Sequence, residues 1–191
     1  MDVDLLNIDI DYDRILSEFT DMNIEQMLID NSYQIAVQCR EGIAVDKQLT
    51  DSCGSLVWDW DAYYPEEDYK NSGPLRRDVV LEESDFDILC DIFKDTYIGE
   101  VVDILQEKYN ITRGRFMMLG MKTCLTYHID KSPRLHIPLI TDDNCFMIID
   151  DKVCRIPYPG TYKVDTTKKH TALNASKILR THLVFVLPKL E

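Results

Sequence analysis

The chain carries a dense run of metal-ligand and arginine residues between positions 127 and 136. It reads Tyr127-His128-Ile129-Asp130-Lys131-Ser132-Pro133-Arg134-Leu135-His136. Two imidazoles and one carboxylate form the facial triad that holds non-haem Fe(II) and leaves coordination positions open. His128 and Asp130 offer the first two members of such a set, and His170 offers the third from a later segment. This pattern predicts a metal site formed by these three side chains.

Alternation along strands predicts which side chains share a face. Residues two apart on a strand point the same way, about 6.5 Å apart along the backbone, so His128 and Asp130 should project to one side of their strand. Arg134 and His136 should share a face of the next strand. His182 is interpreted as a core histidine, with a role as reserve metal ligand if its face points to the site.

Arg180 lies ten residues after His170 in an otherwise apolar segment, residues 178–187. A buried guanidinium needs an anion, because an unpaired buried charge is very costly. No acidic residue occurs within this segment, so the anion must come from elsewhere in the fold or from a ligand. The planar fork of an arginine matches a carboxylate through two parallel hydrogen bonds.

The apolar pattern outside these motifs predicts an α+β fold. Apolar spacing predicts helices over residues 12–19 and 24–28, and a longer one over 86–109 that begins at a capping box in 84–87. The later half instead shows short strands separated by turns, which is typical of a sandwich or small barrel. We therefore expect helices bracing one side of a jelly roll. The expected strands cover residues 32–38, 54–60, 115–119, 124–129, 134–140, 145–149, 161–165 and 179–187, with a surface loop over 62–74.

Length and charge restrict the class of protein. A chain of 191 residues suits a single domain, here an acidic N-terminal part (1–110) and a metal-binding core (111–191). Residues 1–110 carry 27 acidic and 8 basic side chains, and residues 111–191 carry 7 acidic and 13 basic. The acidic half would repel a phosphate backbone, so no nucleic acid is expected as partner. It favours a substrate in cationic surroundings, whereas the basic half suits a small anion.

Neither a secretory signal nor an apolar run long enough for a membrane span is present, so no membrane partner is expected. The six cysteines show no close pairing and are expected to be reduced. These features predict a cytoplasmic protein.

The motifs resemble the Fe(II)/2-oxoglutarate-dependent dioxygenase superfamily, and most closely its aspartyl/asparaginyl β-hydroxylase branch, including small phage-encoded and bacterial members. The resemblance covers roughly residues 114–187, and for a phage-encoded member the cytoplasm would be that of the host. The stretches that carry it are Arg134-Leu-His-Ile-Pro-Leu139, Gly160-Thr-Tyr-Lys-Val-Asp-Thr-Thr-Lys-Lys-His170 and Arg180-Thr-His-Leu-Val-Phe185.

This resemblance implies a double-stranded β-helix, a cupin-like jelly roll, that uses Fe(II), 2-oxoglutarate and O₂. His128, Asp130 and His170 would bind the iron. Arg180 would hold the distal carboxylate of 2-oxoglutarate, with Arg134 and His136 contacting the cosubstrate from a neighbouring strand. Two positions depart from the best-known protein hydroxylases of the family. Those enzymes have glycine where this chain has Asp130, and they offer a hydroxyl where Met117 or its neighbours stand.

The implied reaction hydroxylates an amino-acid side chain, in a protein, a peptide or a free molecule. Two alternatives remain open at this point: a metal-dependent cupin-like enzyme that does not use 2-oxoglutarate, and a non-catalytic jelly-roll module. The oligomeric state stays unknown. Residues expected to build an apolar pocket are Met118, Leu125, Ile137, Ile148 and Phe185, and Trp58, Trp60 and Tyr127 are candidates for lining the substrate entrance.

Overall fold

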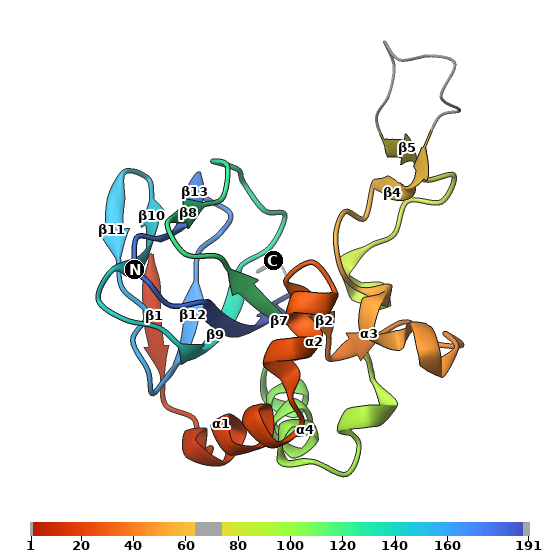
Figure 1. Ribbon diagram of the computed structural model, residues 1–191, viewed down its shortest axis with the longest axis horizontal. Helices are drawn as coiled ribbons and strands as arrows, with labels where there is room; N and C mark the ends of the chain where they lie inside the picture. Colours follow the sequence, from red (N-terminus) through yellow and green to blue (C-terminus); the bar gives the residue numbers. More distant parts are fainter. Residues whose placement is uncertain (1, 64–73, 189–191) are drawn as a thin grey trace.

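Two antiparallel sheets form the centre of the protein, whose computed structural model describes residues 2–63 and 74–188 (Figure 1). A six-stranded sheet has the order β1-β12-β9-β14-β7-β2, and a four-stranded sheet has the order β11-β10-β13-β8. The six-stranded sheet comprises β1 (Val3–Leu6), β2 (Gln34–Ala36), β7 (Thr112–Leu119), β9 (Arg134–Ile140), β12 (Thr161–Val164) and β14 (Arg180–Val186). The four-stranded sheet comprises β8 (Thr123–Cys124), β10 (Cys145–Ile149), β11 (Lys152–Cys154) and β13 (His170–Asn174).

Helices cover one face of the six-stranded sheet, and the four-stranded sheet lies on the other side (Figure 1). The expected mixture of helices and antiparallel strands is therefore present. The helices are α1 (Tyr12–Asp21), α2 (Ile24–Asp30), α3 (Gln48–Asp51) and α4 (Tyr97–Tyr109). Two further two-stranded sheets complete the strands, β3 (Gln38–Cys39) with β6 (Ile88–Leu89) and β4 (Trp58–Tyr63) with β5 (Pro74–Arg76). Short 3₁₀ turns occur at η1 (Val45–Lys47), η2 (Glu83–Asp85) and η3 (Asp91–Phe93).

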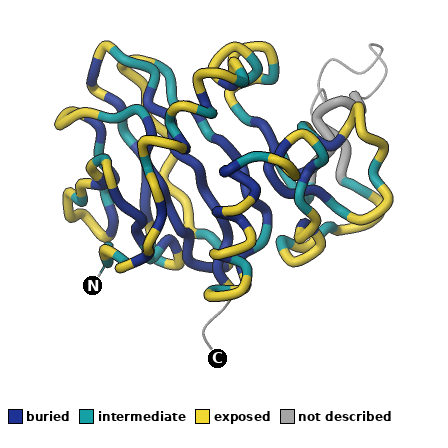
Figure 2. The backbone as a smooth tube through the Cα atoms, turned by 90° about the horizontal axis from the view of Figure 1, so that it is seen from below, coloured by how far each residue is buried: buried dark blue, intermediate teal, exposed yellow. Residues whose placement is uncertain are grey.

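Strand alternation sends one set of side chains towards the helices and the other set between the sheets. On β14, Leu183 and Phe185 are fully buried among the helix-facing core residues. Their neighbours Arg180, His182 and Val184 line a cavity instead. The helix face of the sheet receives Ile15 and Phe19 of α1 and Val101 and Leu105 of α4 within one apolar cluster. In Figure 2 the buried residues run through the middle of the molecule, and the exposed residues concentrate where the chain bends at its edges.

The long helix begins at Tyr97, whereas the sequence pattern predicts a start at residue 86. A capping box does form, but between Glu82 and Asp85, and it closes only the 3₁₀ turn η2. The chain then stays extended, because Leu89 pairs with Gln38 in the small β3–β6 sheet. Helix α4 starts after Thr96, whose side chain accepts a hydrogen bond from the Gly99 amide.

A carboxylate from α1 completes the start of α4. Glu18 accepts hydrogen bonds from the amides of Tyr97 (2.7 Å) and Ile98 (2.9 Å). The first amides of a helix have no partner within the helix, so this tertiary contact satisfies donors that a local box would otherwise serve. The prediction for residues 86–96 was wrong because this distant partner fixes the helix start.

The remaining helix predictions are confirmed. Helices α1 and α2 cover the expected positions, and Asn23 separates them in a left-handed conformation (φ 55°). The longest helix among the described residues has 13 residues, and none of the described helices is long and apolar enough to cross a membrane. All six cysteines are free thiols, as expected.

Candidate active site

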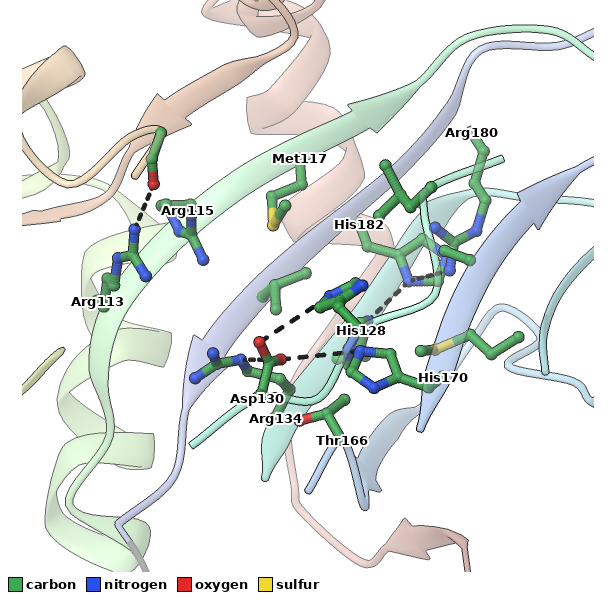
Figure 3. Close-up of a pocket in the computed structure, with 16 residues that line it drawn as sticks. Arg113, Arg115, Met117, His128, Asp130, Arg134, Thr166, His170, Arg180 and His182 are labelled. Carbon is green, nitrogen blue, oxygen red and sulfur yellow. Dashed lines mark hydrogen bonds and ion pairs between the residues drawn. The ribbon is translucent and has the colours of Figure 1, made fainter. Parts of the chain in front are cut away.

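His128, Asp130 and His170 converge on one point. Each offers a ligand atom, and these atoms all lie within 4.8 Å of one another. One oxygen of Asp130 lies 4.0 Å from His128 Nε2, and the other lies 3.8 Å from His170 Nε2 (Figure 3). Two neutral imidazole nitrogens and one carboxylate at this spacing are suited to a divalent transition metal. The structure thus brings together the three residues that the sequence predicts as metal ligands.

The local backbone differs from the predicted strand over 124–129. Strand β8 ends at Cys124, and His128 is joined to β13 only by an isolated bridge. That bridge consists of two hydrogen bonds, from the His128 amide to the His170 carbonyl (3.0 Å) and from the His170 amide to the His128 carbonyl (2.9 Å). The Asp130 amide in turn donates to the Thr166 carbonyl (2.9 Å). These three bonds, rather than one continuous strand, position the ligands.

Backbone carbonyls orient both imidazoles. His128 Nδ1 lies 2.7 Å from the carbonyl of Thr126, and His170 Nδ1 lies 2.9 Å from the carbonyl of Lys168. A carbonyl can only accept, so each Nδ1 carries the proton and each Nε2 keeps its lone pair directed to the shared point. Burial also lowers the pKa of His170, which favours the neutral, ligating form.

A buried ion-pair chain holds the carboxylate of Asp130. Arg134 Nε donates to Asp130 Oδ2 at 3.0 Å, and its two Nη atoms donate to Glu83 at 2.7 and 3.0 Å. Glu83 also accepts from Arg113 Nη1 at 3.2 Å. Burial alone would raise the pKa of Glu83, but the hydrogen bonds from Arg134 and the two arginine charges lower it overall. Glu83 is therefore ionised and fixes Arg134 against Asp130.

The role expected for Arg134 needs revision on this geometry. All three of its donor nitrogens are already bonded to Asp130 and Glu83. Although Arg134 lines the cavity, a cosubstrate would have to compete with two carboxylates for it. The arrangement supports a positioning role for Arg134 towards Asp130.

Arg180 is buried beside two histidines and lacks a carboxylate partner among the described residues. Its Nη2 lies 3.3 Å from His182 Nδ1, and its Nε has no hydrogen-bond partner there. Burial, followed by the charge of Arg180, lowers the pKa of both His136 and His182 well below the ordinary value. Both rings are therefore neutral at pH 7. His182 serves as a neighbour of Arg180, and it is not one of the three residues of the metal-ligand group.

The two histidine tautomers follow from these contacts. Arg180 can only donate, so His182 Nδ1 accepts, and His136 Nδ1, 3.3 Å away, donates to the same nitrogen. Nε2 of His182 then carries a proton and has no partner among the described residues. His136 and His182 thus form a hydrogen-bonded pair next to the guanidinium of Arg180, and all three side chains line one cavity.

One cavity of about 250 Å³ contains both the metal-ligand group and Arg180. Its apolar lining differs from the expected one. Leu125 lines it as predicted, but Met118, Ile137 and Phe185 belong to the helix-facing core. The preceding residue on each strand, which points to the opposite face, lines the cavity instead. The apolar residues that line it are Met117, Leu125, Met147, Ala172 and Val184.

Two more of the residues expected at the pocket, Ile148 and Tyr127, do not line it. Ile148 is not part of the lining, because it alternates with Met147 on β10. Tyr127 is exposed and stacks under Lys169, with Nζ 5.3 Å from the ring centroid, rather than lining the cavity. The side chains of Trp58 and Trp60 lie outside the described residues.

Sequence reasoning missed three charged residues at this site: Glu83, Arg113 and Arg115. Arg113 and Arg115 line the cavity from β7. Their i, i+2 spacing on a strand that precedes the metal motif was a usable signal, since both must share a face. Glu83 gave no local signal, because its partners Arg113 and Arg134 are 30 and 51 residues away.

A family model for aspartyl/asparaginyl beta-hydroxylase matches residues 86–189, more than half of the chain. The chain belongs to this family. The matched region contains all three residues of the metal-ligand group and Arg180. A comparison with curated proteins gives no match.

Solved structures give only weak likenesses. The plu4264 protein from Photorhabdus luminescens is 14% identical over 40% of this chain and 62% of its own, with a TM-score of 0.35. An oxidoreductase of the 2OG-Fe(II) oxygenase family from Burkholderia pseudomallei is 15% identical over 59% of this chain and 60% of its own (TM-score 0.37). EvdMO1 is 12% identical over 95% of this chain and 45% of its own (TM-score 0.42). The chain thus spans less than two thirds of each of these proteins, and the assignment to the family rests on the family model.

Proposed function

We propose that this protein is an Fe(II)- and 2-oxoglutarate-dependent oxygenase that hydroxylates an amino-acid side chain in a protein, a peptide or a free molecule. Family membership supports this proposal. The single observation that carries it is the placement of His128, Asp130 and His170 in one cavity with an arginine, Arg180, that has no carboxylate partner among the described residues.

The donor set fits ferrous iron. Two imidazole Nε2 atoms and one carboxylate would hold Fe(II) and leave coordination positions open for further ligands, whereas a closed four-ligand site would not. The exposed fraction is 40% for the His128 side chain, 21% for Asp130 and only 4% for His170. The site therefore opens to solvent on the His128 side and is closed behind His170.

The Arg180 guanidinium fits the cosubstrate. A buried arginine whose Nε has no acceptor among the described residues lowers its free energy by binding a carboxylate through its fork. Burial lowers the pKa of Arg180 to about 10, so the group still carries its charge at pH 7. The distal carboxylate of 2-oxoglutarate would bind Arg180, while its keto-acid end would reach the metal held by His128, Asp130 and His170.

When bound, Fe(II) and 2-oxoglutarate supply an oxidation with O₂ that places one oxygen atom on a substrate carbon and the other in succinate, with release of CO₂. The chain's own residues orient the reactants and exclude water. Arg134 keeps the Asp130 carboxylate in its ligating orientation, and His182 accepts a hydrogen bond from Arg180. Met117, Met147 and Val184 supply an apolar wall that shields the reacting atoms.

The strand order supports a double-stranded β-helix within a single domain. From β7 onward the chain alternates between the sheets except at the β10–β11 pair, with β7, β9, β12 and β14 in the larger sheet and β8, β10, β11 and β13 in the smaller one. Residues 111–191 would form this core. Residues 1–110 would brace it through α1, α2 and α4.

An anaerobic titration tests the proposal. We expect a visible charge-transfer band when Fe(II) and then 2-oxoglutarate are added to the metal-free protein. The band should be lost in His170→Ala, which removes a metal ligand. It should also be lost in Arg180→Met, which removes the guanidinium that would bind the distal carboxylate of 2-oxoglutarate. Arg155→Met, which removes an exposed arginine outside this cavity, should keep the band.

Two other results would support the alternatives. Metal binding that does not respond to 2-oxoglutarate would indicate a cupin-like enzyme with a different chemistry. A normal band without succinate release in air, across a panel of peptides and amino acids, would indicate a non-catalytic module.

A further inference from the structure

The chain over residues 123–130 runs along the outer edge of the four-stranded sheet. Strand β8 is the last in the order β11-β10-β13-β8, so among the described residues its one neighbour is β13. Beyond β8 the chain stays beside β13, because the Leu125 amide donates to the Ala172 carbonyl (2.9 Å) and His128 forms its two-bond bridge there. Residues 121–129 are all exposed. The stretch that carries two of the metal-ligand residues is therefore also an open sheet edge.

The backbone groups of Tyr127 and Ile129 have no hydrogen-bond partner among the described residues. In an antiparallel pair, the N–H and C=O of one residue point to the same neighbouring strand, and those of the adjacent residues point the opposite way. His128 directs both of its groups to β13, so Tyr127 and Ile129 direct theirs to the open edge. Two donors and two acceptors are thus presented to solvent at the spacing of a strand ladder.

This edge lies at the open side of the metal-ligand group. The ring of His128 points to Asp130 (Figure 3), and the His128 side chain is the most exposed of the three. A strand added to the edge would lie about 4.8 Å from it. Its residue opposite His128 would form a non-hydrogen-bonded pair, in which the two side chains share one face with Cβ atoms roughly 5 Å apart. An extended chain bound here would place one side chain at the mouth of the cavity.

Apolar side chains accompany the unpaired backbone groups. The large exposed apolar residues of this stretch are Met121, Leu125, Tyr127 and Ile129. An exposed apolar patch of this kind marks an interaction site. The backbone groups define the chemistry of the partner, because a ladder of donors and acceptors is matched by successive peptide groups. A polypeptide supplies such a ladder, and a single amino acid does not.

The open edge is short. Strand pairing is regular at Cys124, but one extra residue precedes the bridge at His128, so a bulge interrupts the edge between them. The unpaired groups are therefore confined to residues 127–129. A stable dimer interface buries about 800 Å² on each partner, far more than three residues can expose. The edge suits a short peptide segment rather than a second copy of this chain.

We propose that the substrate is a polypeptide whose main chain binds as an added antiparallel strand at Tyr127 and Ile129, with the side chain opposite His128 entering the metal cavity. This inference rests on the proposed function, and it selects a protein or peptide over a free amino acid as the molecule that is hydroxylated. Main-chain pairing supplies affinity that is independent of sequence, while the cavity selects the side chain. His128 then sets both the metal position and the register of the substrate.

Binding of host peptides to the anaerobic Fe(II)–2-oxoglutarate complex tests the proposal. The probes are acetyl-Thr-Val-X-Val-Thr-amides, in which X is Asp, Asn, His, Lys or Arg and the β-branched neighbours favour an extended chain. The matched controls are the same five amino acids, acetylated and amidated. We expect at least one peptide to bind at least about 10-fold more tightly than its control. It should also slow hydrogen exchange in the fragment 121–130, measured by mass spectrometry, but not in β11 at the far edge of the sheet.

N-methylation of the peptide tests the strand pairing without any change in the protein. Alternate N–H groups of a strand point to opposite edges. With X opposite His128, the two valines pair with Tyr127 and Ile129, whereas the N–H of X points away from the protein. Methylation of both valine nitrogens should therefore weaken binding about 10- to 100-fold, and methylation at X should change it by less than about threefold.

Variants of the edge give a second measurement. Ile129→Pro removes an outward N–H, a change that edge strands tolerate, and should weaken peptide binding about 10-fold. Ile129→Ala keeps that N–H and should lose less. Val153→Ala removes an exposed apolar side chain from β11 and should bind as the wild type does. If Ile129→Pro also loses the charge-transfer band, its metal site is disturbed, and the N-methylated peptides decide the matter.

The outcomes distinguish this inference from the proposed function. Equal binding of the two N-methylated peptides would overturn strand addition and leave the oxygenase proposal standing, as would five peptides that bind no better than their controls. Sedimentation that shows a wild-type dimer and a monomeric Ile129→Pro would assign the edge to a second copy, with the same consequence. Absence of the charge-transfer band in the wild-type protein would overturn the proposed function and this inference with it.

Discussion

Glu83 and Arg134 form a two-pronged ion pair, with Nη2 to Oε1 at 2.7 Å and Nη1 to Oε2 at 3.0 Å. The exposed fraction is 12% for the Glu83 side chain and 8% for that of Arg134. The pair links η2, in the acidic N-terminal half, to β9 in the core. Through Arg134 Nε it also reaches the carboxylate of Asp130.

Replacement of Glu83 should weaken both the fold and the metal site. Glu83→Gln leaves two buried guanidiniums, those of Arg113 and Arg134, without a full counter-charge. We expect unfolding in urea to show a loss of about 3–5 kcal/mol in the free energy of unfolding. The affinity for Co(II), a redox-stable substitute for Fe(II), should fall about 10- to 100-fold because Asp130 loses its orienting partner.

The neighbouring residue offers a matched control for this substitution. Glu82 pairs with Lys131, and the exposed fractions of these side chains are 56% and 61%. Glu82→Gln should cost no more than about 1 kcal/mol and leave Co(II) affinity unchanged. Equal losses in the two variants would show that the Glu83 pair does not hold Asp130.

Metal binding should stabilise the protein through the three-residue group. A ligand that binds only the folded state at 100 times its dissociation constant adds about 2.7 kcal/mol, which corresponds to roughly 5–10 °C in Tm for a chain of this size. We expect this rise when Co(II) is added to the metal-free protein, and its absence in Asp130→Asn. Asp165→Asn removes a partly exposed carboxylate, paired with Lys168, and should show the full rise. A rise that persists in Asp130→Asn would place the metal elsewhere.

Arg180→Met should separate stability from binding. Because the cation is buried with no carboxylate among the described residues, methionine of similar volume should leave the Tm unchanged or raise it, with a gain on the order of 1 kcal/mol or more. The same variant should lose 2-oxoglutarate binding, measured by isothermal titration with Co(II) present. A marked fall in Tm would instead indicate that the guanidinium supports the fold.

The two buried histidines predict a pH-dependent stability of the metal-free protein. Burial lowers the pKa of His136 and His182 in the folded state below the ordinary value of 6.5. Below about pH 6.5 the unfolded chain therefore binds protons that the folded chain does not. The free energy of unfolding then decreases as the pH is lowered, until the folded-state pKa is reached. Each histidine contributes a slope of up to about 1.4 kcal/mol per pH unit.

Urea unfolding at pH 7.5, 6.5 and 5.5 in the presence of a chelator measures this dependence. His182→Gln should reduce the slope of the free energy of unfolding against pH by the contribution of one histidine. An identical slope in the wild type and the variant would mean that His182 is protonated in the folded state.

The metal-ligand group could be predicted from the sequence because each part of it is a local signal. His128 and Asp130 are two residues apart, and Arg180 follows His170 by ten residues in a strand that is otherwise largely apolar. The positioning of Asp130 could not be predicted, because Glu83 acts through a contact that spans 51 residues. The same holds for the start of α4, where Glu18 supplies the cap from 79 residues away.

The apolar wall of the cavity shows a different kind of error. Alternation from Arg180 places Val184 in the cavity and Phe185 on the helix side, as the structure has it. The same rule extended from Arg113 and Arg115 selects Met117 rather than Met118. The predicted residues Met118 and Phe185 were wrong because each lies an odd number of positions from these arginines, so that its side chain points to the opposite face of the strand.

The position of Glu83 has a consequence for dissecting this protein. The stretch that matches the family begins at residue 86, so Glu83 lies just outside it. A fragment trimmed to that stretch would keep every ligand atom and both arginines, Arg113 and Arg134, yet it would lack the Glu83 carboxylate that bridges them. Such a fragment would contain the reactive groups without the bond that aligns them, so its inactivity would say nothing about the chemistry of the intact chain.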